Sequence, residues 1–131
     1  MSTEKMKILI VDDDTFLLNM YAMKFTKADL EVKTATSGEQ ALEILRDGFQ
    51  PQIMMLDIIM PTIDGLELLE QAKKDHLVDG AVYVMLSNQG DAKDIDRAKK
   101  LGVHGYIVKA TTIPSEVVTE VMNIYNNNKK T

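Results

Sequence analysis

The chain has 131 residues, of which 45% are hydrophobic and 27% charged, a composition typical of an ordinary soluble domain long enough to bury a core. Its formal net charge of −5 argues against a general nucleic-acid binder, and no apolar stretch approaches the roughly 18 residues of a membrane span. Residues 1–7 are polar, which argues against a signal peptide, and the absence of cysteine excludes disulfides and thiolate metal sites. We therefore expect a cytoplasmic protein that binds neither membranes nor nucleic acid directly.

Short apolar runs alternate with amphipathic segments along the chain. Apolar runs between turn residues are typical of buried strands, whereas apolar residues three and four apart indicate helices. Strands are predicted over 7–11, 31–35, 53–57, 81–86 and 104–108. Helices are predicted over 15–28, from 37 to a stop at 48, over 66–74 and 91–101, and from 112 or 114 to about 126. A frayed tail is expected over 127–131.

Local signals support two of the helix starts. Asp14 is a suitable N-cap for the first helix, and Ser37 with Gln40 has capping-box spacing before the second. In the first helix, Phe16, Met20 and Met23 fall on one apolar face, with Leu17 and Tyr21 beside them.

The fivefold alternation of strand and helix predicts an α/β fold. Such alternation implies a parallel sheet with helices on both faces. No repeat, linker or low-complexity segment interrupts it. We expect one domain over 1–131, with its core at about 6–126, and no second domain in this chain.

Polar groups stand where four of the predicted strands end. Asp12 and Asp13 end the first strand, Asp57 the third, Ser87 the fourth and Lys109 the fifth. Each has an ordinary explanation as a cap, a turn residue or a surface charge. However, the carboxyl ends of parallel strands meet at one edge of the sheet, which is where ligands bind in such folds. Four such coincidences favour a functional site.

The residue types at this edge suit phosphoryl transfer. Crowded carboxylates repel one another, and Mg²⁺, which prefers oxygen ligands, relieves that repulsion. A carboxylate such as Asp57 forms an aspartyl-phosphate as a nucleophile. We expect the Ser87 hydroxyl to donate to a phosphoryl oxygen and the Lys109 ammonium to neutralise its charge.

Over essentially its whole length, the chain resembles the receiver domain of a two-component response regulator, of the single-domain kind found in chemotaxis regulators. The similarity rests on four segments: Ile8–Asp13, Leu56–Pro61 with Asp64-Gly65, Leu86-Ser87, and Gly105–Lys109. It implies a flavodoxin-like, doubly wound sheet of five strands in the order 2-1-3-4-5, with five helices.

The resemblance implies a role for each group at this edge. Asp57 accepts a phosphoryl group from a histidine kinase or histidine phosphotransfer protein. Mg²⁺ is held by Asp12, Asp13, Asp57 and the backbone carbonyl of Ile59. The domain catalyses only its own phosphorylation and dephosphorylation, so it is not a conventional enzyme.

The resemblance also implies an output and a lifetime for the phosphorylated state. Ser87 moves inward and Tyr106 rotates, which changes the surface of the fourth helix, fifth strand and last helix for a downstream protein target. Ile59 and Gln89 flank the phosphoryl group in this family and tune hydrolysis. The family usually has a cis proline after the lysine; here Ala110 follows Lys109, which leaves the geometry of that peptide bond open.

Two alternatives remain. Asp12 and Asp14 superficially supply the acidic pair of a haloacid-dehalogenase-type phosphatase, although Phe16 stands where that family has threonine or valine. The other alternative is a receiver-like interaction module that is never phosphorylated; the intact Asp57, Ser87 and Lys109 argue against it.

Overall fold

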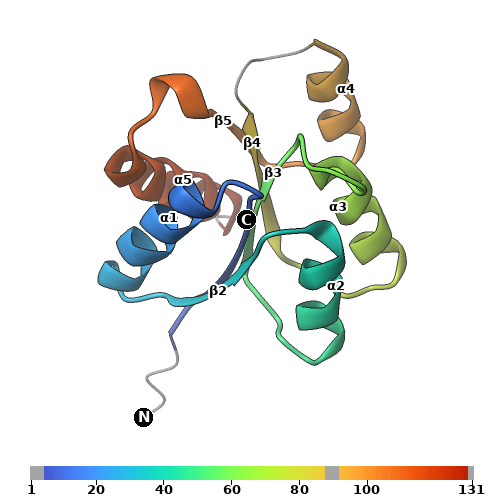
Figure 1. The fold of residues 1–131 in the computed structure, drawn as a ribbon, viewed down its shortest axis with the longest axis horizontal. Coiled ribbons are helices and arrows are strands. Elements are labelled where there is room, and N and C mark those ends of the chain that lie inside the picture. Colours follow the sequence, from blue (N-terminus) through green and yellow to red (C-terminus); the bar gives the residue numbers. More distant parts are fainter. Residues whose placement is uncertain (1–4, 88–91, 130–131) are drawn as a thin grey trace.

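The structure, a computed structural model, describes residues 5–87 and 92–129 (Figure 1). The strands are β1 (Lys7–Val11), β2 (Glu31–Ala35), β3 (Ile53–Asp57), β4 (Val82–Ser87) and β5 (Gly105–Val108). The helices are α1 (Thr15–Lys27), α2 (Gly38–Arg46), α3 (Gly65–Lys74), α4 (Ala92–Lys100) and α5 (Pro114–Lys129), with a short 3₁₀ helix, η1, over Lys109–Thr111.

All strand pairs are parallel, and the sheet order is β2-β1-β3-β4-β5. Helices α1 and α5 cover one face, and α2, α3 and α4 cover the other (Figure 1). The predicted doubly wound α/β fold and its strand order are therefore confirmed. The order reverses between β1 and β3, which places a topological switch point at the strand that ends in Asp57.

Strand β3 is buried on both faces because its residues alternate between two cores. Met54 and Leu56 belong to the core beneath α2, α3 and α4. Ile53 and Met55 belong to the core beneath α1 and α5. A continuous apolar run suits a central parallel strand, since neither of its faces meets water.

The predicted apolar face of α1 is wrong. Leu18, Tyr21 and Phe25 are the residues that α1 buries, whereas Phe16 is 72% and Met23 is 53% exposed. Both sets follow helical spacing and lie on opposite sides of the helix, because two residues advance a helix by about 200°.

The helix starts follow side-chain caps. Asp14 caps α1, since its Oδ1 accepts from Leu17 N–H at 3.1 Å. Ser37 caps α2 through Gln40 N–H at 3.1 Å, but Gln40 Oε1 accepts from Thr36 N–H rather than completing a capping box. A complete capping box occurs instead at α3, as described below.

The C-terminal helix is longer than predicted. Helix α5 continues to Lys129, past residue 127, where a frayed tail was expected. The Asn128 side chain donates to the Ile124 carbonyl at 2.8 Å, one turn earlier in the same helix.

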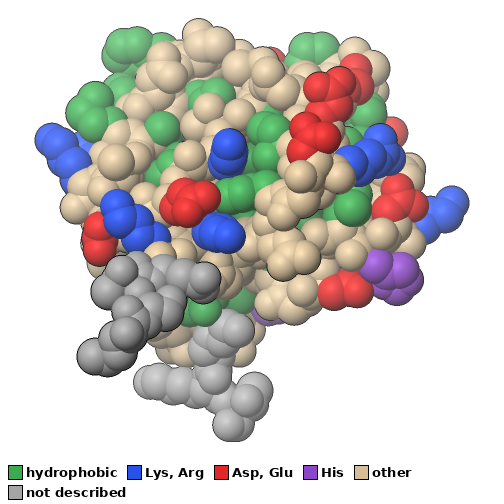
Figure 2. Space-filling model, turned by 90° about the horizontal axis from the view of Figure 1, so that it is seen from below, with side chains coloured by type: hydrophobic (Ala, Val, Ile, Leu, Met, Phe, Trp, Pro, Cys, Tyr) green, Lys and Arg blue, Asp and Glu red, His purple; other side chains and the backbone are tan. Residues whose placement is uncertain are grey.

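Over the described residues, no helix combines the length and apolar character needed to cross a bilayer. Seen from below the view of Figure 1, the molecule presents acidic and basic side chains intermixed rather than gathered by sign (Figure 2).

Candidate functional site

Three polar residues are buried where β1, β3 and β4 end. Asp12 is 0% exposed, and Asp57 and Ser87 are each 5% exposed. Asp13, beside Asp12, is exposed. Burial of carboxylates costs free energy unless they are paired, so their partners determine what this edge of the sheet does.

Lys109 pairs with both buried carboxylates. Its Nζ lies 2.7 Å from Asp12 Oδ2 and 3.2 Å from Asp57 Oδ2, and its side chain is only 6% exposed. Burial alone would lower the pKa of Lys109, but the contacts with Asp12 and Asp57 outweigh it and hold the pKa above its ordinary value. The lysine is therefore a fixed positive charge between the two strand ends.

One lysine does not offset all of the negative charge. Burial raises the pKa of Asp57 to about 7 even though Lys109 acts in the opposite direction, and Asp12 and Asp13 add to the rise. The charged form of Asp57 therefore still lacks compensation in the protein alone.

The carboxylates lie close enough together to share a cation. Asp12, Asp13 and Asp57 each offer one carboxylate oxygen, and these three oxygens lie within 4.8 Å of one another. Such an all-oxygen set, partly open to solvent through Asp13, fits Mg²⁺, which keeps several waters and bridges to phosphate oxygens. Asp12 is oriented by its Oδ1, which accepts from Asp14 N–H at 2.9 Å. The Ile59 carbonyl as a further ligand stays a prediction.

The loop after Asp57 is held tightly against it. Gly65, the first residue of α3, donates its N–H to the Ile58 carbonyl at 2.8 Å. A β-carbon at Gly65 would lie 2.1 Å from the Asp57 carbonyl oxygen, so only glycine fits there. Between them, Ile63 N–H donates to Pro61 O at 2.8 Å across Thr62, whose φ of 68° is unusual for a β-branched residue.

The two predicted switch residues lie on neighbouring strands. Ser87 ends β4 opposite Val108, and Tyr106 lies two pairs earlier on β5, opposite Met85. Tyr106 is half-buried and, with Ile95 of α4, lines an apolar groove of about 380 Å³ between α4 and β5. Because Met85 and Tyr106 pack into the core beneath α4, both predicted switch residues occupy the α4 side of the sheet.

The remaining predicted site residues are placed less centrally. Ile59 is 69% exposed, at the start of the loop that follows Asp57. Gln89 lies outside the described residues. The Lys109–Ala110 peptide is trans, as are the other peptide bonds of the described chain. The sequence predicts that five residues meet at one edge of the sheet, and the structure places them there: Asp12, Asp13, Asp57, Ser87 and Lys109.

Three features near the site were not predicted. The Asp64 side chain accepts from Glu67 N–H and Glu67 from Asp64 N–H, a capping box whose Asp-x-x-Glu spacing is visible in the sequence. Arg97 of α4 contacts Asp64, and no local signal in the sequence indicates that contact. The close approach of Gly65 to Asp57 is the third.

Comparison with known proteins agrees with this geometry. The family model described as response regulator receiver domain matches residues 8–121. The chain is 31% identical over 124 residues to a probable transcriptional regulator, ycf27, of Porphyra purpurea, covering 95% of this chain and 49% of that protein. It is 29% identical over 119 residues to the chemotaxis protein CheY of Halobacterium salinarum, covering 88% of this chain and 96% of that protein.

Solved structures show the same fold. A CheY-like receiver domain protein from Methanospirillum hungatei superposes with a TM-score of 0.86 at 26% identity, covering 97% of this chain and 98% of that one. The chain spans about half the length of the ycf27 relative that it matches. On the family match over residues 8–121 and the shared fold, this chain belongs to the response regulator receiver domain family.

Proposed function

We propose that this chain accepts a phosphoryl group on Asp57 from a histidine kinase or histidine phosphotransfer protein in a Mg²⁺-dependent reaction. The observation that carries the proposal is the position of Asp57 at the end of a central strand, within reach of Asp12, Asp13 and Lys109. The receiver family consists of signalling domains rather than conventional enzymes, in keeping with this role.

The reaction follows from the geometry of these groups. An Asp57 oxygen attacks phosphorus in line with the donor nitrogen; the new P–O bond forms as the P–N bond breaks, and its electron pair stays on the donor imidazole. Lys109 lies 3.2 Å from Asp57 Oδ2, close enough to neutralise charge on a phosphoryl oxygen. Mg²⁺, when bound by the three aspartates, supplies further charge neutralisation and orientation. The buried Ser87 hydroxyl donates to a second phosphoryl oxygen.

We propose that the signal leaves through the α4–β5–α5 surface to a downstream protein target. Ser87 and Tyr106 are on adjacent strands, and Tyr106 lines the groove beside α4. A shift of Ser87 toward the phosphoryl group would therefore change the space that Tyr106 occupies. A net charge of −5 fits a protein partner better than direct binding to nucleic acid, and we place the protein in the cytoplasm. We also propose that residues 1–131 form a single domain.

The acceptor is tested by labelling with acetyl phosphate and Mg²⁺, followed by intact mass spectrometry. We expect one phosphoryl group on the wild type and none on Asp57→Asn. Asp14→Asn is the matched control, because it removes a neighbouring charge while an asparagine still caps α1. Equal labelling of wild type and Asp57→Asn would show that another residue is the acceptor.

Two further measurements, turnover of a phosphate ester and labelling by a phosphorylated histidine donor, separate the alternatives. The family match favours a receiver over a haloacid-dehalogenase-type phosphatase, and steady turnover of a phosphate ester would reverse that preference. No labelling of the wild type by acetyl phosphate or by a phosphorylated histidine donor would favour an interaction module that works without phosphate.

A further inference from the structure

Helix α4 is held to the rest of the protein by little apolar packing. Over residues 93–100, Ala98 is the buried side chain, Asp94 and Ile95 are half-buried, and the others are exposed. Most of these residues are charged. Because packing contributes little here, polar contacts supply a larger share of what holds α4 than they do for the other helices.

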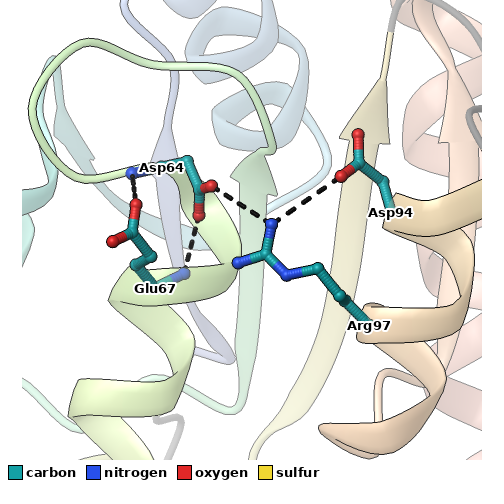
Figure 3. Close-up of polar contacts among 4 residues, drawn as sticks. All are labelled: Asp64, Glu67, Asp94 and Arg97. Atoms are coloured by element: carbon teal, nitrogen blue, oxygen red, sulfur yellow. Dashed lines mark hydrogen bonds and ion pairs between the residues drawn. The ribbon is translucent and has the colours of Figure 1, made fainter.

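Arg97 makes such a contact, and it reaches out of its own helix. Its Nη1 lies 3.4 Å from Asp64 Oδ2, in the loop between β3 and α3, and 3.8 Å from Asp94 Oδ1 on α4 itself (Figure 3). The Arg97 side chain is 48% exposed and that of Asp64 is 25% exposed. The guanidinium therefore bridges two segments 33 positions apart in sequence.

The Asp64 carboxylate is held in its orientation by contacts that do not involve Arg97. Its Oδ1 accepts from Glu67 N–H at 2.7 Å, and Glu67 Oε1 accepts from Asp64 N–H at 3.1 Å (Figure 3). The carboxylate thus has its orientation set by the capping box and presents Oδ2 to α4. A partner that is pre-organised in this way reduces the ordering cost of an ion pair, which is otherwise a main reason why surface pairs contribute little.

The segment that Arg97 contacts adjoins Asp57. Gly65, next to Asp64, touches the Asp57 main chain and donates to the Ile58 carbonyl. On the other side, Ile95 and Ala98 of α4 line the apolar groove of about 380 Å³ that Tyr106 shares. A continuous series of contacts therefore runs from Asp57 through Gly65 and Asp64 to Arg97 and the groove.

We propose that the Asp64–Arg97 ion pair is a tether that holds α4 in its resting position and limits opening of the groove between α4 and β5. Arg97 is then a positioning residue, which acts on the groove through α4. The tether is a property of the unmodified protein, so it stands whether or not Asp57 is phosphorylated. Any event that moves the β3–α3 loop would alter the tether and, through it, α4.

The test is hydrogen exchange of the unmodified protein, read on peptides from residues 93–100. Loss of a surface ion pair corresponds to about two- to five-fold faster local opening. We expect that acceleration in Arg97→Gln and in Asp64→Asn, which keeps the α3 cap but loses the charge. In the double variant we expect no further acceleration, because the two changes remove the same contact.

Matched variants make the test specific. Asp94→Asn removes the partner within α4 and should change exchange less than Asp64→Asn. Arg46→Gln breaks a similar exposed pair, Arg46 with Asp75 at 3.3 Å, and should leave α4 exchange unchanged. Arg97→Lys should restore part of the protection. Raised salt should accelerate α4 exchange in the wild type but not in Arg97→Gln. Unchanged exchange in Arg97→Gln, additive effects of Arg97→Gln and Asp64→Asn, or equal effects of Asp64→Asn and Asp94→Asn would each overturn the tether.

Discussion

Gly65 lies directly against the main-chain carbonyl of Asp57: a β-carbon at Gly65 would stand 2.1 Å from that oxygen and 2.9 Å from its carbon. Main-chain atoms cannot move aside as the end of a flexible side chain can. We therefore expect Gly65→Ala to displace the Asp57 loop and to lower the free energy of unfolding by about 1–3 kcal/mol. Urea unfolding measures this change.

Gly38→Ala is the control for that measurement. Gly38 also begins a helix, but its added β-carbon would meet its nearest neighbour, Ile63 Cβ, at 3.0 Å, so a much smaller displacement suffices than at Gly65. We expect a loss below about 1 kcal/mol. Equal losses in the two variants would mean that contact with the Asp57 main chain is not what requires glycine at 65.

Asp13 is the exposed member of the three-aspartate cluster, so its removal should weaken metal binding with little effect on the core. We expect Asp13→Ala to bind Mg²⁺ at least about ten-fold more weakly, equivalent to about 1.4 kcal/mol. Calorimetric titration gives the affinity. Asp14→Asn, which removes a neighbouring charge outside the cluster, should bind nearly as the wild type does. If Asp13→Ala titrates like the wild type, the metal assignment is wrong.

Ile59 is expected to control how long a phosphoryl group stays on Asp57. Its side chain is 69% exposed and carries no polar atom that could orient an attacking water. We expect the wild type to lose its phosphoryl group slowly and Ile59→Asn to lose it about three- to ten-fold faster, since asparagine admits and orients water. The measurement is decay of the labelled protein after the donor is removed. Ile113→Asn, at another exposed isoleucine, should decay as the wild type does. An equal or slower rate in Ile59→Asn would remove Ile59 from this role.

His104 should make stability depend on pH. Its Nδ1 accepts from Tyr83 N–H at 2.9 Å, which requires Nδ1 to carry no proton. Burial lowers the pKa of His104 below 6.5, and Lys73 adds to that effect. Well above pH 6.5, His104 carries no extra proton in either the folded or the unfolded state, so the stabilisation from its hydrogen bond with Tyr83 is fully present. As the pH falls below that value, the unfolded chain takes up a proton before the folded protein does, so the free energy of unfolding decreases.

Replacing His104 by asparagine tests this pH dependence, because its side-chain oxygen can still accept from Tyr83 N–H but does not titrate. Between about pH 7.5 and about pH 5.5, we expect His104→Asn to lose less stability than the wild type. Parallel slopes in wild type and His104→Asn would exclude the Tyr83 contact as the cause.

The fold was predictable because its strongest signals are local. The sequence shows both the apolar run that becomes the fully buried β3 and the polar residues at four strand ends. Parallel topology alone then brings those ends together. The family resemblance supplied the strand order. Each strand begins and ends within one residue of its predicted position.

The parts that the sequence did not indicate depend on tertiary placement. The buried face of α1 could not be chosen from spacing, since Phe16 and Leu18 begin two apolar stripes on opposite sides. The contact of Arg97 with Asp64 depends on where α4 packs relative to the β3–α3 loop. Strand β5 begins one residue later than predicted, at Gly105, where His104 uses its side chain to bond Tyr83 N–H.

The placement of every site group at the carboxyl ends of the strands leaves the opposite edge available for labelling. At about 3.3 Å per residue, the five residues of β3 hold the two edges roughly 16 Å apart. The turn between α2 and β3 at that far edge has open space around Gly48, and Gln50 is exposed. Because the chain contains no cysteine, Gln50→Cys would provide one unique thiol for a fluorescent or spin probe, remote from the reacting carboxylates.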